Sequence, residues 1–297
     1  MTEELQQGVV VRQTLSATEL AAIRSLAQLC ERDEGIDLRI NWGALESRSG
    51  EVSSDFLYYK DGALVGFLTA DGLGFVEAEA TGMVYPSHRR QGVWRALVAA
   101  AQTECLRQDT TSLILIADQR SRAAKPTCEA LGARYIFSEH KMELAAGSRL
   151  APIERRLDFR PATVEDAPAI AAILAEDFGS DAERVRPKIL TNMQRQSHQY
   201  YIARLHDEPV GTVNIQVLDD IPYIYGFVVR PEYRGHGYGR EILVRTIEDA
   251  VATRPQTMVL EVESENTPAL SLYRSCGFVI VTTHDYYRLE PAAAPVG

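Results

Sequence analysis

The sequence has little of what marks several classes of protein. Its 297 residues include only four cysteines, at positions 30, 105, 128 and 276, and no two of them form a CxxC pair. Scattered cysteines in a chain of this length predict reduced, buried thiols and no disulfide framework. Because no histidine lies at metal-ligand spacing from a cysteine, we also expect no zinc and no other metal.

Long apolar runs and basic clusters are lacking as well. No apolar stretch approaches the roughly 18–20 residues that a membrane-spanning helix needs, so we expect no membrane partner. The first residues, MTEELQQG, are acidic and polar, unlike a secretory signal, which predicts a cytoplasmic protein. The net charge is −10 and both halves hold more acidic than basic residues, which argues against nucleic acid as a partner.

What the sequence does contain is an internal repeat at an offset of 145 residues. The segment ALVGFL at 63–68 precedes EPVGTV at 208–213 by this distance. Single residues that match at the same offset are Pro86 and Pro231, Arg89 and Arg234, Gly92 and Gly237, Gly132 and Gly277, and Leu144 and Leu289. One constant offset over so long a stretch predicts a duplicated domain. The predicted ranges are 1–147 for the first copy, 148–156 for a polar linker, 157–291 for the second copy and 292–297 for a tail.

Alternating strand and helix patterns in each copy predict an α/β (α+β) fold, with a central mixed sheet flanked by helices. In the second copy, we expect strands over 157–160, 199–205, 209–218, 223–229 and 257–262, and closing strands within 278–289. Helices are expected over 166–177, 238–253 and 268–275. Thr163, with Asp166 three residues later, is a capping signal for the first of these helices.

The most informative motif is RGHGYG at 234–239, which follows a predicted strand and opens a predicted helix. Glycines allow positive φ angles that turn several N–H groups to one side, and such groups at a helix N-terminus bind a pyrophosphate. The alternative is a glycine-rich turn without a ligand. The position between a strand and an amphipathic helix favours the anion site.

The segments FVVRPEYRGHGYG and LEVESENTPALSLYRSCGF resemble the GCN5-related N-acetyltransferases (GNAT), which use acetyl-CoA. The family fingerprint is a Gln or Arg, a Gly three residues later and a Gly or Ala two further on, met here by Arg234, Gly237 and Gly239. The resemblance covers the second copy and, more loosely, the first. It implies two tandem GNAT domains and an acyltransferase that moves acetyl from acetyl-CoA directly to a primary amine.

The resemblance also implies roles for single residues. Strand residues would pair with the pantetheine arm, loop amides would hold the pyrophosphate, and Asn266 would hydrogen-bond the cofactor. Tyr273 would be the general acid that protonates the departing thiolate. The cofactor-binding residues implied in this way are Phe227, Val228, Val229, Arg234, Gly235, His236, Gly237, Tyr238, Gly239 and Asn266.

A general base is less sharply indicated. Glu261 lies twelve residues before Tyr273, the spacing seen in acetyltransferases that modify ribosomal alanine N-termini. Glu263 and Glu265 compete with it, because Glu261 and Glu263 share one face of an alternating strand. The alternative is a carboxylate bound to backbone or to an Arg, with a water chain taking the proton of the amine.

The first copy keeps the loop but not the chemical residues. A possible second cofactor site consists of Val84, Arg89, Arg90, Gln91 and Gly92. Trp94 stands where the second copy has the last glycine of its loop. Ile116, Ser121 and Cys128 replace the carboxylate, the amide and the phenol of the second copy. We therefore expect a catalytically degenerate first domain that either binds cofactor or shapes the substrate cleft.

The acceptor is left open between a small-molecule amine and a peptide N-terminus. The motif LEVESEN favours protein N-termini, whereas the duplicated layout resembles mycothiol synthase, which acetylates a small thiol-bearing amine. Candidates for the border of the acceptor cleft in the second domain are Tyr223, Tyr225, Tyr286 and Tyr287, with core packing as the alternative. The alternative hypothesis is that the protein is not an enzyme but an acyl-CoA sensor. The retained Tyr273 and Asn266 disfavour this alternative.

Overall fold

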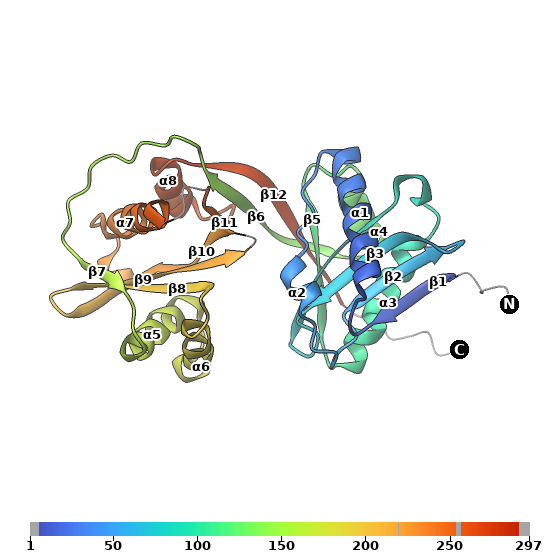
Figure 1. Cartoon of the computed structure of the whole chain (residues 1–297), viewed down its shortest axis with the longest axis horizontal. Coiled ribbons are helices and arrows are strands. Elements are labelled where there is room, and N and C mark those ends of the chain that lie inside the picture. Colours follow the sequence, from blue (N-terminus) through green and yellow to red (C-terminus); the bar gives the residue numbers. More distant parts are fainter. Residues whose placement is uncertain (1–5, 219, 254–256, 291–297) are drawn as a thin grey trace. The chain divides into compact units, whose positions relative to one another are not determined.

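The computed structural model describes residues 6–218, 220–253 and 257–290, and the chain divides into two compact units. Unit 1 contains residues 1–139 and 282–297, and unit 2 contains residues 140–281. Each unit is a mixed sheet with helices on both faces (Figure 1), which confirms the predicted α/β duplication. Among the described helices, none combines the length and the apolar character that crossing a bilayer requires.

In unit 1 the sheet order is β1-β2-β3-β4-β5-β12-β6, and β4 and β5 run parallel. Alternation along the strands separates two cores: Leu57 and Phe67 pack with α1, whereas Phe56 and Leu68 pack with α3. The elements are β1 (Gly8–Arg12), α1 (Ala17–Glu34), α2 (Trp42–Glu46), β2 (Asp55–Lys60), β3 (Ala63–Asp71), β4 (Glu77–Val84), the short 3-10 helix η1 (Pro86–His88), α3 (Val93–Arg107), β5 (Ser112–Asp118), α4 (Ala124–Ala130) and the start of β6 (Arg134–Leu144).

In unit 2 the sheet order is β7-β8-β9-β10-β11-β6-β12, and β10 and β11 run parallel. Tyr200 and Ile202 pack with α5 and α6 on one face, whereas Val213 and Leu260 pack with α7 and α8 on the other. The elements are β7 (Asp158–Pro161), η2 (Val164–Asp166), α5 (Ala167–Phe178), α6 (Ala182–Met193), β8 (His198–Leu205), β9 (Glu208–Leu218), β10 (Ile221–Val229), η3 (Pro231–Tyr233), α7 (Tyr238–Thr253), β11 (Val259–Glu263), α8 (Thr267–Ser275) and the start of β12 (Phe278–Leu289).

Each unit is completed by the last strand of the other sequence repeat. The end of β6 brings the fully buried Met142 into the core formed with α7 and α8. The end of β12 pairs antiparallel with β5 and buries Tyr287 in the core of unit 1. Met142 and Tyr287 are equivalent at the offset of 145, so the exchange is symmetric. The predicted ranges 1–147 and 157–291 therefore follow the sequence repeat, whereas the compact units exchange strand ends.

Two expectations about the C-terminal segment are wrong. Residues 278–289 form one continuous strand, β12, and not several closing strands. Tyr286 and Tyr287 lie in unit 1 and not in the second domain, because β12 continues into the sheet of unit 1. Tyr286 is buried there and stacks on Phe137, with ring centroids 4.3 Å apart.

The first helical segment of each repeat begins with a capping box. Ser16 Oγ accepts a hydrogen bond from Glu19 N, and the Glu19 carboxylate accepts one from Ser16 N. In unit 2, Thr163 N donates to Asp166 Oδ2 at 2.9 Å, which confirms the predicted capping signal. Asp166 also pairs with Arg160 at 2.7 Å, so this cap fixes β7 to the start of α5.

Candidate functional site

The loop between η3 and α7 in unit 2 has the backbone shape of an anion-binding nest. Gly235 and Gly237 have φ angles of +79° and +83°, and residues 234–237 are exposed. Backbone in this region turns successive N–H groups to one side, and α7 begins directly afterwards with the positive end of its dipole. The loop therefore fits a pyrophosphate group.

The side chain of Arg234 holds the loop in place. Its Nε donates to the Val229 carbonyl at 2.8 Å, and its Nη2 lies 2.5 Å from Asp177 Oδ1. These contacts join the end of β10 to the end of α5. Arg234 thus lies at the predicted anion site, and its guanidinium stabilises the conformation of the loop through these two contacts.

A second arginine, Arg156, lies beside the loop and was not predicted from the sequence. Arg156, from the segment before β7, donates to the His236 carbonyl at 2.5 Å, and its guanidinium lies 4.8 Å from the centre of the Tyr238 ring. His236 Nδ1 in turn lies 2.9 Å from the Arg234 carbonyl. Arg156 adds positive charge at the nest. It could not be found from the motif, since it precedes His236 by 80 residues.

Strands β10 and β11 separate next to this loop. Their parallel pairing joins Tyr223 to Val259 and Ile224 to Leu260, and continues no further in the described strands. Residues 227–229 therefore follow the last position at which β10 pairs with β11. An edge of this kind can accept an extended chain as an additional strand would bind, which is the role predicted for the backbone of Phe227 to Val229.

A β-bulge lies at the same point of β10. The register with β9 shifts between Tyr225, opposite Asn214, and Val228, opposite Thr212. Gly226 within this bulge has a φ angle of +54°, and a Cβ atom on it would lie 2.5 Å from Asn214 Nδ2. The bulge thus requires glycine. A glycine within a strand pattern is a bulge signal that the sequence analysis did not use.

Tyr273, the predicted general acid, extends from α8 into the core beside the separated strands. Its ring lies 6.2 Å from that of Phe227 and 6.1 Å from that of Phe278, and the residue is 8% exposed. Burial raises the pKa of the Tyr273 phenol to about 12. The group therefore stays protonated at neutral pH, as a proton donor must.

The other predicted polar residues lie on the surface. Asn266 is exposed and caps α8, where its Oδ1 accepts from Ala269 N at 3.2 Å. Glu261 and Glu263 are exposed on β11, whose intervening Val262 is buried in the core with α7 and α8. Both carboxylates therefore lie on the opposite face of the sheet, which α5 and α6 cover.

A row of polar side chains crosses the sheet on that face. Tyr200, Asn214 and Tyr225 lie opposite one another on β8, β9 and β10. Tyr225 Oη donates to Tyr200 Oη at 3.3 Å. Asn214 is 1% exposed, and in the described part of the chain its Oδ1 has no hydrogen-bond partner. On the next strand, Glu261 follows Val259 by two positions, as Tyr225 follows Tyr223, which places the predicted base at the end of this row.

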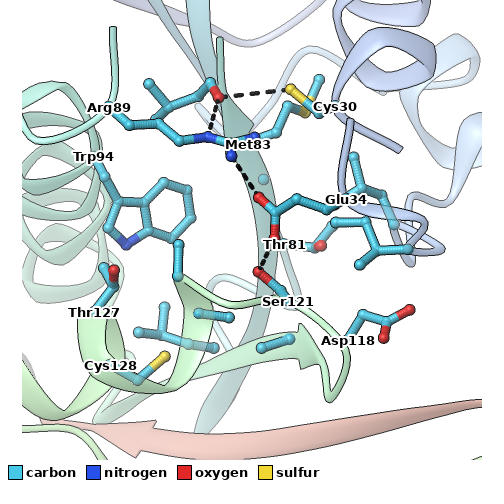
Figure 2. A pocket seen from close by; sticks show the side chains of 18 of the residues that line it. Cys30, Glu34, Thr81, Met83, Arg89, Trp94, Asp118, Ser121, Thr127 and Cys128 are labelled. Atoms are coloured by element: carbon cyan, nitrogen blue, oxygen red, sulfur yellow. Dashed lines mark hydrogen bonds and ion pairs between the residues drawn. The ribbon is translucent and has the colours of Figure 1, made fainter. Parts of the chain in front are cut away.

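Unit 1 contains a pocket of about 840 Å³ at the equivalent place (Figure 2). It lies beyond Ala80 and Leu115, the last parallel pair of β4 and β5. The loop before α3 borders it and repeats the backbone signature of unit 2, with φ angles of +60° at Arg90 and +85° at Gly92. Val84 and Arg89 line the pocket as well.

One wall of this pocket is a chain of polar contacts. Figure 2 shows Glu34 between Arg89 and Ser121, across the pocket from Trp94 and Cys128. Arg89 Nη1 lies 2.6 Å from Glu34 Oε1, and Ser121 Oγ donates to Glu34 Oε2 at 2.7 Å. The Arg89 Nε donates to the strand end as Arg234 does in unit 2. The two loops are thus built alike.

The chemical positions of unit 1 differ from those of unit 2. Cys128, in the place of Tyr273, is 4% exposed, and burial raises the pKa of its thiol to about 12. The pairing of β3 with β4 runs from Gly66 opposite Val84 to Asp71 opposite Glu79 without a register shift. The buried thiol and the strand without the bulge distinguish unit 1 from unit 2, and the degeneracy of the first domain stays a prediction.

The two copies exchange an aromatic residue and a glycine at this point. A Cβ atom on Gly82 would lie 2.9 Å from the Trp94 ring, and one on Gly239 would lie 3.8 Å from the Phe227 ring. Positions 82 and 94 correspond to 227 and 239 at the offset of 145. The aromatic ring therefore comes from the helix in unit 1 and from the strand in unit 2. Trp94 forms part of the pocket lining.

The fold and the site define a coenzyme A-dependent acyltransferase class, and the comparison with known families agrees. The model of the acetyltransferase (GNAT) family matches residues 20–133 and 167–278, so the chain belongs to the GNAT family and is an acyltransferase. Acetyl-CoA is the usual acyl donor of this family, and amines are its acceptors. In the ranges that the structure describes, no three His, Cys, Asp or Glu side chains are grouped as metal ligands.

Relatives match the chain over its length or over one half. It is 28% identical over 302 residues to a mycothiol acetyltransferase of Streptomyces griseus, covering 93% of this chain and 95% of that enzyme. It is 32% identical over 148 residues to the N-alpha-acetyltransferase RimI of Mycobacterium tuberculosis, covering 46% of this chain and 91% of that enzyme.

Solved structures share the two-unit fold. A GCN5-related N-acetyltransferase from Sphaerobacter thermophilus has a TM-score of 0.81 at 19% identity, covering 98% of both chains. A tandem GNAT protein from the clavulanic acid biosynthesis pathway has a TM-score of 0.71 at 18% identity, covering 98% of this chain and 100% of that one. At these identities the likeness concerns the fold alone.

Proposed function

We propose that unit 2 transfers an acetyl group from acetyl-CoA to a primary amine. The proposal rests on three features that lie close together at the gap where β10 separates from β11. They are the nest at Gly235 and Gly237, the separated strand ends themselves, and the protonated Tyr273. The bulge at Gly226 adjoins the same gap. Unit 1 has the nest and the separation, but neither the phenol nor the bulge.

Each of these features has a chemical task. When bound, acetyl-CoA supplies a thioester with an acyl carbon that a neutral amine attacks. The nest and Arg156 hold the diphosphate, and the backbone of residues 227–229 aligns the pantetheine arm, which lowers the entropic cost of bringing the reactants together. Tyr273 donates its proton to the sulfur. Glu261, or its neighbour Glu263, accepts the proton of the amine.

The acceptor is a small-molecule amine or a peptide N-terminus. Both kinds are represented among the relatives, one named for mycothiol and one for α-amino groups. The polar row of Tyr200, Asn214 and Tyr225 leads across the α5/α6 face to Glu261. We assign the α5/α6 face to the acceptor. The proposed cofactor site uses the nest at the start of α7 and Tyr273, which packs on the opposite face with α7 and α8.

The test is acetyl transfer from acetyl-CoA to alanine N-methylamide and to cysteamine, followed by mass spectrometry of the N-acetylated product. The variant Gly237→Asp keeps a residue that tolerates positive φ but places a carboxylate in the nest, so it should abolish turnover. Gly8→Asp is the matched control, because Gly8 has a φ angle of +80° with nothing within 4 Å of a Cβ atom. Unchanged turnover in Gly237→Asp would contradict the assignment of the reaction to unit 2.

We further propose that unit 1 binds a second coenzyme A molecule without turning it over. The pocket of about 840 Å³ and the nest at Arg90 and Gly92 support this site, and Val84, Arg89 and Gln91 belong to the same loop region. Calorimetric titration of acetyl-CoA should give two sites in the wild type and one in Gly92→Asp. A single site in the wild type that Gly237→Asp removes would contradict the second site.

A further inference from the structure

Three aromatic residues that pack together in unit 2 are all small in unit 1. Phe227, Tyr273 and Phe278 form a continuous contact, with successive ring centroids 6.2 and 6.1 Å apart. At the offset of 145 their counterparts are Gly82, Cys128 and Ala133. Because these three residues are smaller than the rings, they leave space in unit 1. This space lies on the face of the sheet that corresponds to the face of Tyr273 in unit 2, where we place the reacting sulfur.

The pocket of unit 1 lies beside two of these three positions. Gly82 and Cys128 line it, and Trp94 of α3 lines it as well, with its ring next to Gly82. On the α3 side the pocket is lined by Cys128, Leu115 and Leu131, and on the α1 side by Leu38 and Met83. Ile36 and Ile116 also line it, and these apolar side chains are its inner part.

We propose that unit 1 binds acyl-CoA molecules whose apolar acyl chain is several carbons longer than acetyl. The diphosphate lies on the nest, and the thioester lies at Cys128, the counterpart of Tyr273. The chain then continues along the apolar inner part, where each buried methylene favours binding. The proposal rests on the second coenzyme A site proposed for unit 1.

The site is suited to binding and not to transfer. The Cys128 thiol is buried and protonated, since burial raises its pKa to about 12. Ile116 stands where unit 2 has Glu261, so β5 offers no carboxylate at that position. Glu34, on the far wall, is engaged by Arg89 and Ser121. A bound acyl-CoA would therefore report the supply of acyl chains without consuming them.

The experiment compares octanoyl-CoA with acetyl-CoA by calorimetry in the full-length Gly237→Asp protein, in which only the site of unit 1 can bind. We expect octanoyl-CoA to bind about tenfold or more tightly than acetyl-CoA. Equal affinities would leave the second coenzyme A site standing and overturn the inference. Binding of neither ligand would overturn the second site itself. The acetyl transfer of unit 2 is measured separately, so its failure stays distinguishable.

A variant that fills the pocket tests where the chain lies. Cys128→Leu should lower the affinity for octanoyl-CoA about tenfold and leave that for acetyl-CoA within about twofold. If Cys128→Leu weakens both ligands because it folds poorly, Leu131→Phe enlarges a pocket-lining side chain that packs in the same core as Cys128. Retained preference for octanoyl-CoA in whichever variant folds would overturn the placement of the chain.

Discussion

At the scale of the residue, Tyr273 and Cys128 occupy equivalent positions in the two units but differ in size and chemistry. Both side chains are buried at equivalent positions after the separated strands, and burial raises the pKa of each to about 12. A phenol and a thiol that stay protonated differ in reach, because the phenol carries its proton farther from the backbone. The same burial therefore supports the proton donor proposed for unit 2 and the acyl-chain site proposed for unit 1.

Replacing Tyr273 with Phe should lower kcat about 100-fold, since general acid catalysis contributes about 10²–10⁴-fold, with unchanged binding of acetyl-CoA. Because the pKa of Tyr273 is about 12, the acid form is present across pH 6–10 and lost only as the pH rises through 12. Its ionisation therefore causes no fall in kcat within that range.

Tyr201→Phe is the matched control for this substitution. Tyr201 is another buried tyrosine of unit 2 whose pKa burial raises to about 12, and its ring stacks on Phe159 away from the loop. Steady-state kinetics from pH 6 to 10 on both variants separate the proton donor from general packing. A kcat for Tyr273→Phe within twofold of the wild type would rule out the acid role.

At the scale of the element, β10 depends on one glycine for its bulge. Gly226→Ala places a Cβ atom 2.5 Å from Asn214 Nδ2 and adds strain at positive φ, so it should cost about 2–4 kcal/mol of stability and lower turnover. Gly179→Ala, at a φ angle of +60° with open space around it, measures the φ strain alone. Urea unfolding compares the two. An equal loss in both variants would show that the contact with Asn214 is unimportant.

The capping boxes allow a second comparison between equivalent elements. Asp166 accepts hydrogen bonds from Arg160, Thr163 N and Arg204, which hold the pKa of its carboxyl well below the usual range. A lowered pKa means that the stabilisation is present above the ordinary value of 3.8 and is lost as the pH falls below it.

Asp166→Ala should therefore cost about 3 kcal/mol near pH 7 and much less near pH 2. Glu19→Ala removes the matching cap of unit 1, whose carboxylate lies 2.8 Å from a single arginine, Arg12, and should cost about 1 kcal/mol. Thermal unfolding at several pH values measures both. A cost for Asp166→Ala that does not change with pH would contradict the ionic origin.

The elements of unit 2 were largely predictable, because their signals are local. Apolar periodicity placed α7 at 238–253, and the loop glycines lie in the predicted nest. The position of Arg156 depends on which segments pack together, and no local pattern contains that information. The bulge had a local signal, the glycine at 226 within a strand pattern, although the partner that makes this glycine necessary, Asn214, lies on another strand. The orphaned Asn214 Oδ1 likewise arises only when three strands are aligned.

At the scale of the whole molecule, the exchange of strand ends limits how the chain can be divided. Residues 1–147 alone lack Tyr287, which is buried in the core of unit 1, and the strand that pairs with β5. Residues 148–297 alone lack Met142, which is buried in the core of unit 2. The sequence repeat did not reveal the exchange, because each copy contains an equivalent last strand of its own.

Separate expression of residues 1–147 and 148–297 should therefore give poorly folded fragments, since each core is incomplete and each sheet has an exposed edge. Coexpression should give a complex that copurifies and unfolds cooperatively. Affinity purification through a tag on one fragment and circular dichroism during heating measure this. Cooperative unfolding of monomeric residues 1–147 alone would contradict the requirement for the exchange.

The exchanged aromatic and glycine residues also have a genetic consequence. Duplicated segments of one gene can overwrite each other by recombination, which makes the copies identical again. A tract that copied Phe227 alone into position 82 would place a side chain where a Cβ atom lies 2.2 Å from the Phe67 carbonyl, and would leave Trp94 in place. Such a hybrid would have to shift the backbone of β3 and the ring of Trp94, so it should be less stable than either natural arrangement. An exchange between the two copies is therefore expected to be tolerated only when the strand and the helix positions change together.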